Sequence, residues 1–227
     1  MARQSTGRTA RESTDRTYDS LAERAYHELR DQLVLLDIPP GSPINEAQLA
    51  LELGIGRTPI REGLKKLEQD HLVVSFPRRG TFATRVDLTD LADISELRQV
   101  LEPVAAAGAA RRAAPELRAQ LAAKAEQIGA MDHDPADRRG LMEYDLEVHR
   151  LIYRAAGNPH IEETLVRLDN LATRIWCLVL DRLPDVAAHI HEHVDLLRAI
   201  VDGDADKAAT LAGEHVARFE ASVRRVL

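Results

Sequence analysis

Apolar residues recur at helical spacing near the start of the chain. Leu21, Ala25, Leu29 and Leu33 repeat every four residues, and the pattern stops before residues 39–41, where two prolines and a glycine follow one another. Positions four apart lie on the same side of an α-helix, and proline cannot continue one. The pattern therefore predicts an amphipathic helix with one buried face.

A second, shorter helix is indicated by its end signals. Asn45 can accept a hydrogen bond as the N-cap, with Gln48 three residues later, and the helix runs to Leu53. Gly54 suits the left-handed conformation that ends many helices. Since only a short turn separates this helix from the next, the pair predicts a helix-turn-helix.

The second helix of this pair has an apolar side and a basic side. Thr58 can cap it, and Pro59 suits its first helical position, where a missing amide hydrogen costs nothing. Ile60, Leu64 and Leu67 form the apolar stripe at positions i, i+4 and i+7. The basic residues lie on another stripe or just before the cap: Arg57, Arg61 and Lys65.

A β-hairpin with a basic tip is predicted after this helix. Residues 71–76 and 81–86 are rich in β-branched and aromatic side chains, which favours two strands. The run between them, Pro-Arg-Arg-Gly, favours a tight turn with Arg78 and Arg79 at its tip. A helix-turn-helix followed by such a hairpin is a winged helix, whose second helix enters the major groove of DNA.

Residues 20–84 resemble the DNA-binding domain of GntR-family transcription regulators. The resemblance rests on Pro39, Pro40, Gly41, Leu49, Ala50, the run from Gly56 to Leu64, Leu67 and the run from Arg79 to Phe82. It implies that Arg57, Thr58 and Arg61 contact bases or phosphates in the major groove, and that the tip of the wing enters the minor groove. The candidate DNA-binding residues are Arg57, Thr58, Arg61, Lys65, Arg78, Arg79 and Gly80.

Two positions depart from the family pattern. Gly56 stands where serine is usual, which removes a hydroxyl that can contact phosphate. Gly63 stands where alanine is usual, and glycine inside a helix costs about 1 kcal/mol relative to alanine. Close packing at Gly63 is therefore expected to set how this helix sits against its neighbours.

From residue 87 onward the helical pattern continues to the end of the chain. Breaks divide it into six predicted helices, for which an antiparallel bundle is the economical packing. The first of them carries Ile94, Leu97, Leu101 and Val104 on one stripe. The breaks lie at Pro115, residues 132–140, residues 157–159, Pro184 and residues 202–204.

Titratable residues from three of these helices share faces with apolar residues. Asp145 and His149 are four apart on one helix, and His193 and His215 lie on the last two. A carboxylate and imidazoles are costly to bury without partners, and one divalent ion would satisfy all four. The alternative is a set of separate core histidines, each bonded to a backbone carbonyl. For the four residues together, a metal ion is the better interpretation.

The second half also resembles the FCD effector-binding domain of the FadR subfamily. That resemblance implies that the aspartate and three histidines hold zinc, nickel or a similar ion. Arg98, followed by Glu102, matches an arginine that in the family reaches the effector pocket, where it can pair with a ligand carboxylate. A salt bridge at the domain surface is the alternative for Arg98. Six helices rather than seven indicate the shorter, VanR-like type.

The other histidines of this half are assigned by their positions. His189 lies at the edge of the His193 face and is an alternative ligand, whereas His191 points away from it. His133 and His160 fall in predicted turns, where solvation is expected.

Charge and composition modify this picture only in part. The net charge is −7, but residues 1–86 carry 13 Lys and Arg against 12 Asp and Glu, so the acidic excess belongs to the remainder. A local basic face can still bind phosphate. Cys177 is the only cysteine, which agrees with a reducing compartment. The N-terminus is polar and no run is apolar enough to span a membrane, so a soluble cytoplasmic protein is expected.

The sequence thus predicts a mainly α-helical protein with a flexible tail at 1–17, a winged helix-turn-helix at 18–84 and an FCD-type effector-binding and dimerisation domain at 85–227. We expect a homodimeric repressor that reads a palindromic double-stranded operator and binds a small organic acid through a divalent metal. A metal sensor is one alternative. A metal-dependent enzyme is another, although no separate general base and no Gly-x-Ser-x-Gly motif is found.

Overall fold

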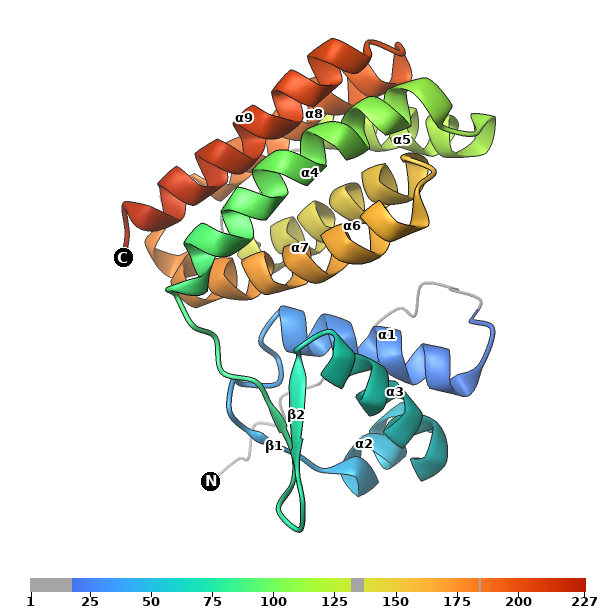
Figure 1. Cartoon of the computed structure of the whole chain (residues 1–227), viewed down its shortest axis with the longest axis vertical. Coiled ribbons are helices and arrows are strands. Elements are labelled where there is room, and N and C mark those ends of the chain that lie inside the picture. The colour runs from blue at the N-terminus through green and yellow to red at the C-terminus, as the bar shows by residue number, and fades with distance from the viewer. Residues whose placement is uncertain (1–17, 132–136, 184) are drawn as a thin grey trace, which may run out of the picture.

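A computed structural model describes residues 18–131, 137–183 and 185–227, and it shows a small N-terminal head beneath a bundle of long helices (Figure 1). The predicted tail at 1–17 and His133 lie outside the described residues. The mainly helical fold class is confirmed. None of the described helices combines the length and the apolar character that a membrane crossing requires.

The head is a winged helix-turn-helix. Its three strands form one antiparallel sheet in the order β1-β3-β2, and β2 and β3 form the hairpin that the sequence predicted. The short strand β1 was not predicted; it pairs with β3 through Pro43 and Ile44. The elements are α1 (Leu21–Val34), β1 (Pro43–Ile44), α2 (Glu46–Leu53), α3 (Arg57–Gln69), β2 (Val73–Phe76) and β3 (Gly80–Ala83).

The end signals of α2 act as predicted, whereas those of α3 do not. The Asn45 side chain accepts hydrogen bonds from two backbone amides of α2, and Gly54 ends the helix with a φ of 63°. Helix α3 begins earlier than predicted, with Gly56 as its N-cap and no side-chain cap, so Thr58 lies inside the first turn. Glycine at the N-cap therefore leaves the first amide groups of α3 without a side-chain partner.

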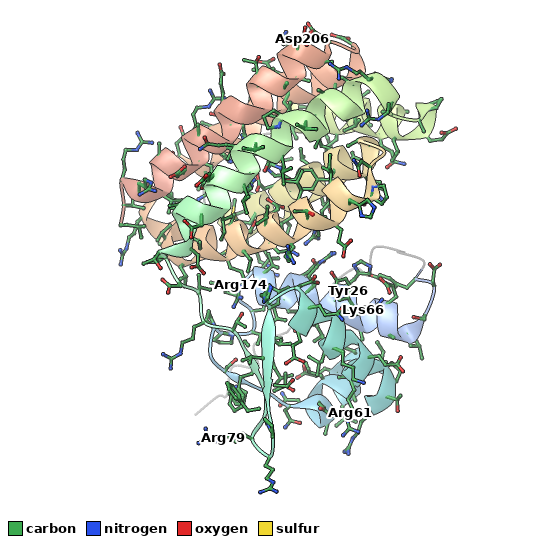
Figure 2. All side chains as sticks on the ribbon, in the orientation of Figure 1. Tyr26, Arg61, Lys66, Arg79, Arg174 and Asp206 are labelled. Atoms are coloured by element: carbon green, nitrogen blue, oxygen red, sulfur yellow. The ribbon has the colours of Figure 1, made fainter. Side chains whose placement is uncertain are left out.

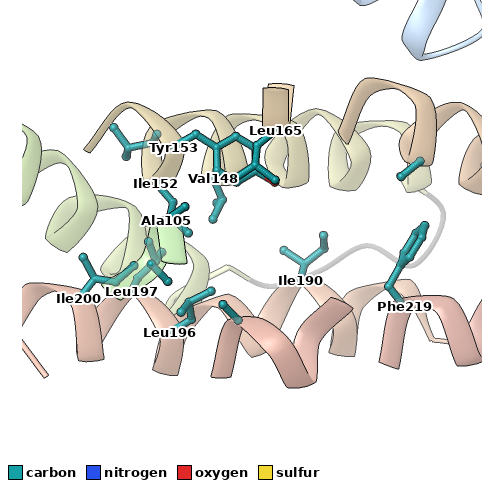
Figure 3. Close-up of a cluster of buried hydrophobic side chains, with 14 of the residues drawn as sticks. Ala105, Val148, Ile152, Tyr153, Leu165, Ile190, Leu196, Leu197, Ile200 and Phe219 are labelled. Carbon is teal, nitrogen blue, oxygen red and sulfur yellow. The ribbon is translucent and has the colours of Figure 1, made fainter. Parts of the chain in front are cut away.

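The described part of the second half contains six α-helices, as predicted, and a short 3₁₀ helix. Apolar side chains from several of these helices meet in one core, part of which is drawn in Figure 3. The elements are α4 (Asp90–Arg112), α5 (Pro115–Gly129), α6 (Arg138–Ala155), α7 (Pro159–Val179), η1 (Leu180–Arg182), α8 (Val186–Val201) and α9 (Ala205–Arg224).

The predicted apolar stripe of α4 is confirmed only in part, because Ile94 is 7% exposed and Leu101 packs against the core. Leu97 and Val104 are each 51% exposed, whereas Arg98 and Glu102 are each only 3% exposed. The charged pair is buried because partners on other helices neutralise it, as described below. Part of the apolar side of α4 consequently lies on the surface of the chain.

Gly63 packs against α1, and we expect Gly63→Leu to destabilise the head. A Cβ atom at Gly63 would lie 3.0 Å from the backbone nitrogen of Tyr26, which cannot move away as a flexible side chain can. Overpacking of this kind typically costs about 1–3 kcal/mol in the free energy of unfolding, which urea titration measures. At Gly129 a Cβ would meet nothing within 4 Å, so Gly129→Leu is the matched control. Equal losses in both variants would contradict the tight contact.

Candidate metal centre and nucleic-acid interface

Asp145, His149, His193 and His215 meet inside the bundle. Helix α6 carries the first two, α8 carries His193 and α9 carries His215, and all four are buried. One ligand atom of each lies within 4.8 Å of the others. The Nε2 atom of His149 is 3.4 Å from that of His193 and 3.3 Å from that of His215. Asp145 Oδ1 lies 3.8 Å and 3.7 Å from the Nε2 atoms of His149 and His193.

Hydrogen bonds at Nδ1 indicate which imidazole nitrogen carries the proton. His193 Nδ1 lies 3.1 Å from the carbonyl oxygen of Ile190, and His215 Nδ1 lies 3.1 Å from Glu192 Oε2. Both partners can only accept, so both histidines donate from Nδ1. His149 Nδ1 lies 3.1 Å from the Tyr153 hydroxyl, which itself donates to Glu102. All three Nε2 atoms therefore turn unprotonated lone pairs toward one point.

The donor set fits a divalent metal ion. The Nε2 lone pair of His149 is repelled by those of His193 and His215 at 3.4 and 3.3 Å, and Asp145 Oδ1 is buried without a hydrogen-bond partner. Nitrogen ligands about 2.0–2.1 Å from one tetrahedral ion are separated by about 3.3–3.4 Å. Three imidazoles and one carboxylate are a combination of ligands that zinc and nickel accept.

The pKa values of these groups agree with neutral imidazoles. Burial lowers the pKa of His193 to about 3, and it lowers the pKa of His149 and His215 well below the ordinary histidine value. Burial, together with the nearby charge of Asp169, raises the pKa of Asp145 well above the usual aspartate value. A cation bound between Asp145 and the imidazoles would stabilise the charged form of the Asp145 carboxylate, which burial alone disfavours.

The sequence did not reveal all residues that surround this centre. Glu192 accepts from His215, and Arg218 Nε lies 2.8 Å from the other oxygen of Glu192. His189 is buried between Trp176 and His215, with ring centroids 4.4 Å and 4.1 Å away, and it does not join the four-residue set. The position of Glu192 beside His193 in the sequence was a usable signal, because metal-binding imidazoles commonly donate to a carboxylate.

Arg98 and Glu102 form a buried ion pair next to the centre. Arg98 Nε donates to Glu102 Oε1 at 2.6 Å, and Arg98 Nη2 lies 3.2 Å from Asp169 Oδ1. Although burial opposes it, the charges of Glu102 and neighbouring acids raise the pKa of Arg98. The alternative of a salt bridge at the domain surface is therefore wrong. Tyr153 joins the pair to His149, because its hydroxyl contacts both Glu102 and that imidazole.

The candidate DNA-binding residues all lie exposed on α3 or at the tip of the wing. Arg61 and Arg79 lie at the end of the head away from the bundle (Figure 2). Arg61 Nε is 2.6 Å from Glu46 Oε2 on α2, an exposed pair whose partner DNA phosphate can replace. The N-terminus of α3 has no side-chain cap, and free amide groups at a helix N-terminus favour anions. The structure brings together Arg57, Thr58, Arg61 and Lys65 on α3, and Arg78, Arg79 and Gly80 on the wing.

The wing turn holds one arginine in an unusual backbone conformation. Arg78 has a φ of 64°, a region that side-chain-bearing residues avoid and glycine adopts freely. The amide of Arg79 donates to the Phe76 carbonyl at 3.1 Å and closes the turn. An arginine kept in a conformation that suits glycine is typical of a functional position.

Two family sequence models match the chain. "Bacterial regulatory proteins, gntR family" matches residues 21–83, and "FCD domain" matches residues 93–218. The HTH-type transcriptional repressor RspR of Escherichia coli is 24% identical over 87% of this chain and 86% of its own length. An HTH-type transcriptional regulator from an unstable DNA locus of Streptomyces ambofaciens is 28% identical over 88% of this chain and 83% of its own length.

Solved structures share the whole fold. E. coli McbR/YncC superposes with a TM-score of 0.75, at 20% identity, and covers 92% of this chain and 99% of its own. A GntR regulator from Rhodococcus superposes with a TM-score of 0.66, also at 20% identity, over 91% of this chain and 98% of its own. Both similarities concern the arrangement of helices and strands and not the ligands.

Proposed function

This chain belongs to the GntR family of DNA-binding transcription regulators and carries an FCD domain, and we propose that it is a repressor that releases its operator when a small carboxylate binds a metal ion in the bundle. Since the family and the relatives are transcription regulators, the protein is not an enzyme, and the metal-dependent enzyme alternative is set aside.

The convergence of three imidazole lone pairs on one point carries the effector proposal. Asp145, His149, His193 and His215 would hold the ion, for which zinc or nickel suits the donors. The bound ion supplies a Lewis acid that can anchor a carboxylate. Arg98 and Glu102 lie next to this centre, and an incoming carboxylate would pair with Arg98 in exchange for an acidic partner.

The head is proposed to bind the operator through α3 and the wing. Arg61 and Arg79 lie at the end of the head away from the bundle (Figure 2), so the duplex can approach them without meeting the acidic second half. We assign residues 18–84 to DNA binding and residues 85–227 to effector binding and dimerisation. The seven exposed residues named above supply the contacts, and Gly56 contributes its backbone rather than a hydroxyl.

Dimerisation is proposed to bury the exposed apolar side of α4. Leu97, Val100 and Val104 are 51%, 63% and 51% exposed and follow one another at i, i+3 and i+7. Apolar side chains gathered on one helix face are stabilised when a partner covers them. A second copy of the chain suits this role, because two copies place two reading heads on the half-sites of a palindrome.

We expect Val100→Glu to weaken the dimer by at least about tenfold, because a carboxylate would lose its hydration in the interface. Sedimentation equilibrium measures the dissociation constant. Ala119→Glu, on an exposed position of α5, is the control. A Val100→Glu protein that dimerises like the control would show that α4 is not the interface.

A screen of small carboxylates tests the effector. A ligand that binds only the folded protein at about 100 times its dissociation constant adds about 2.7 kcal/mol of stability and raises the melting temperature. The carboxylate that does so should release operator DNA, and a chelator should abolish its effect. If removal of the metal alone releases DNA and no acid does, the metal-sensor alternative holds instead.

A further inference from the structure

Helix α6 has one face toward the candidate metal centre and another toward the DNA-binding head. Asp145 and His149 face the candidate metal centre. Their immediate neighbours, Leu146 and Arg150, face the DNA-binding head. Successive residues of an α-helix are turned by about 100°, so one rigid helix can serve both sides.

Leu146 and Arg150 both contact residues of the head. Leu146 is 2% exposed and belongs to the core of the head together with residues of α1 and α3. Arg150 Nη1 donates to Asp31 of α1 at 2.9 Å, and Arg150 Nη2 donates to Asn170 of α7 at 3.1 Å. Farther along the same face of α6, Arg139 forms a two-pronged contact with Asp37.

The Arg150 contact is charged and poorly hydrated. Its side chain is 15% exposed, and its Nε atom is buried without a hydrogen-bond partner. Such a group is sensitive to small displacements, because each lost hydrogen bond leaves a buried donor unpaired. Arg30 also contacts Asp31, so Asp31 keeps a partner if Arg150 is removed.

Two of the four candidate ligands belong to α6, so occupancy of the centre bears on the position of this helix. An ion held by Asp145 and His149 fixes the rotation of the helix about its axis. Without the ion, the Nε2 lone pair of His149 lies 3.4 Å from that of His193 and 3.3 Å from that of His215, and their repulsion favours separation of the rings. A change in rotation carries Leu146 and Arg150 with it, because each adjoins a ligand in the sequence.

We propose that Arg150, supported by Leu146, is the positioning residue through which the metal centre of the bundle controls the orientation of α1 and hence of the reading head. This inference rests on the proposed function, since it requires that the centre binds metal. It assigns the coupling to one helix with a ligand face and a head face.

Hydrogen exchange of α1 with and without metal tests the proposal in the full-length protein. In the wild type, zinc loading should slow amide exchange in residues 21–34 by about tenfold relative to the chelated protein. In Arg150→Met, which keeps a long side chain but loses the donors, this metal-dependent difference should disappear. Zinc affinity, measured by competition with a chromophoric chelator, should stay within about threefold of wild type, because the four ligands are unchanged.

The control is Arg154→Met, an exposed arginine one turn farther along α6. It should keep the full metal-dependent difference. Two results overturn the inference: a wild type that binds zinc with no change in α1 exchange, or an Arg150→Met protein whose exchange still responds like the control. A wild type that binds no zinc would overturn the proposed metal centre, and this inference with it.

Discussion

His193→Ala is expected to abolish metal retention. Protein purified without chelator under metal-replete conditions should carry about one divalent ion per chain by elemental analysis. The variant should bind it more than about 100-fold more weakly, because loss of a direct ligand costs more than loss of a group that merely orients one. The substitution also leaves a void where the imidazole ring was, because His193 is fully buried inside the bundle.

Two controls separate a lost ligand from a damaged fold. His160→Ala removes an exposed histidine and should leave the metal content unchanged. The chelated wild type and the chelated variant should differ less in melting temperature than the two metal-loaded proteins do, because only the wild type gains stability from the ion. Acidification should release the ion from the wild type, since protons compete for the same lone pairs. A wild type without metal would return these histidines to the role of ordinary core residues.

The double variant Arg57→Ala, Arg61→Ala is expected to lose operator binding by a factor of about 100 or more. Each arginine is exposed at the N-terminal end of α3, and a good arginine contact to a base contributes about 1–3 kcal/mol. If both also neutralise phosphates, the slope of log affinity against log salt should become shallower by about 2. Fluorescence anisotropy on an operator selected from random duplexes measures both quantities.

A matched pair of arginines far from the head tests whether charge alone explains the loss. Arg182→Ala with Arg225→Ala removes two exposed arginines of the helical domain. This variant has the same net charge as the first and should keep the operator affinity and the salt slope. Loss of affinity in both variants would mean that total charge, rather than the reading helix, controls binding.

Periodicity predicted the helices well where one helix face meets a single apolar core. The first helix buries Ala25, Leu29 and Leu33 as expected, although Leu21 is exposed. The stripe of α4 was predicted from the same rule and held for Ile94 but not for Leu97 and Val104, because Arg98 and Glu102 occupy part of the core side. Their burial depends on Asp169 and Tyr153 from two other helices, and no spacing within α4 reveals those partners.

The sequence by itself determined the α-helices, the wing hairpin and the faces that carry the candidate ligands, since spacing within a helix decides which residues share a side. The tertiary structure alone decided that four ligand atoms meet, that the imidazoles turn Nε2 toward one another, and that α6 contacts the head through Arg150. The reason is geometric: a pattern defines a face relative to its own helix axis, and only the packing of several helices decides what that face meets.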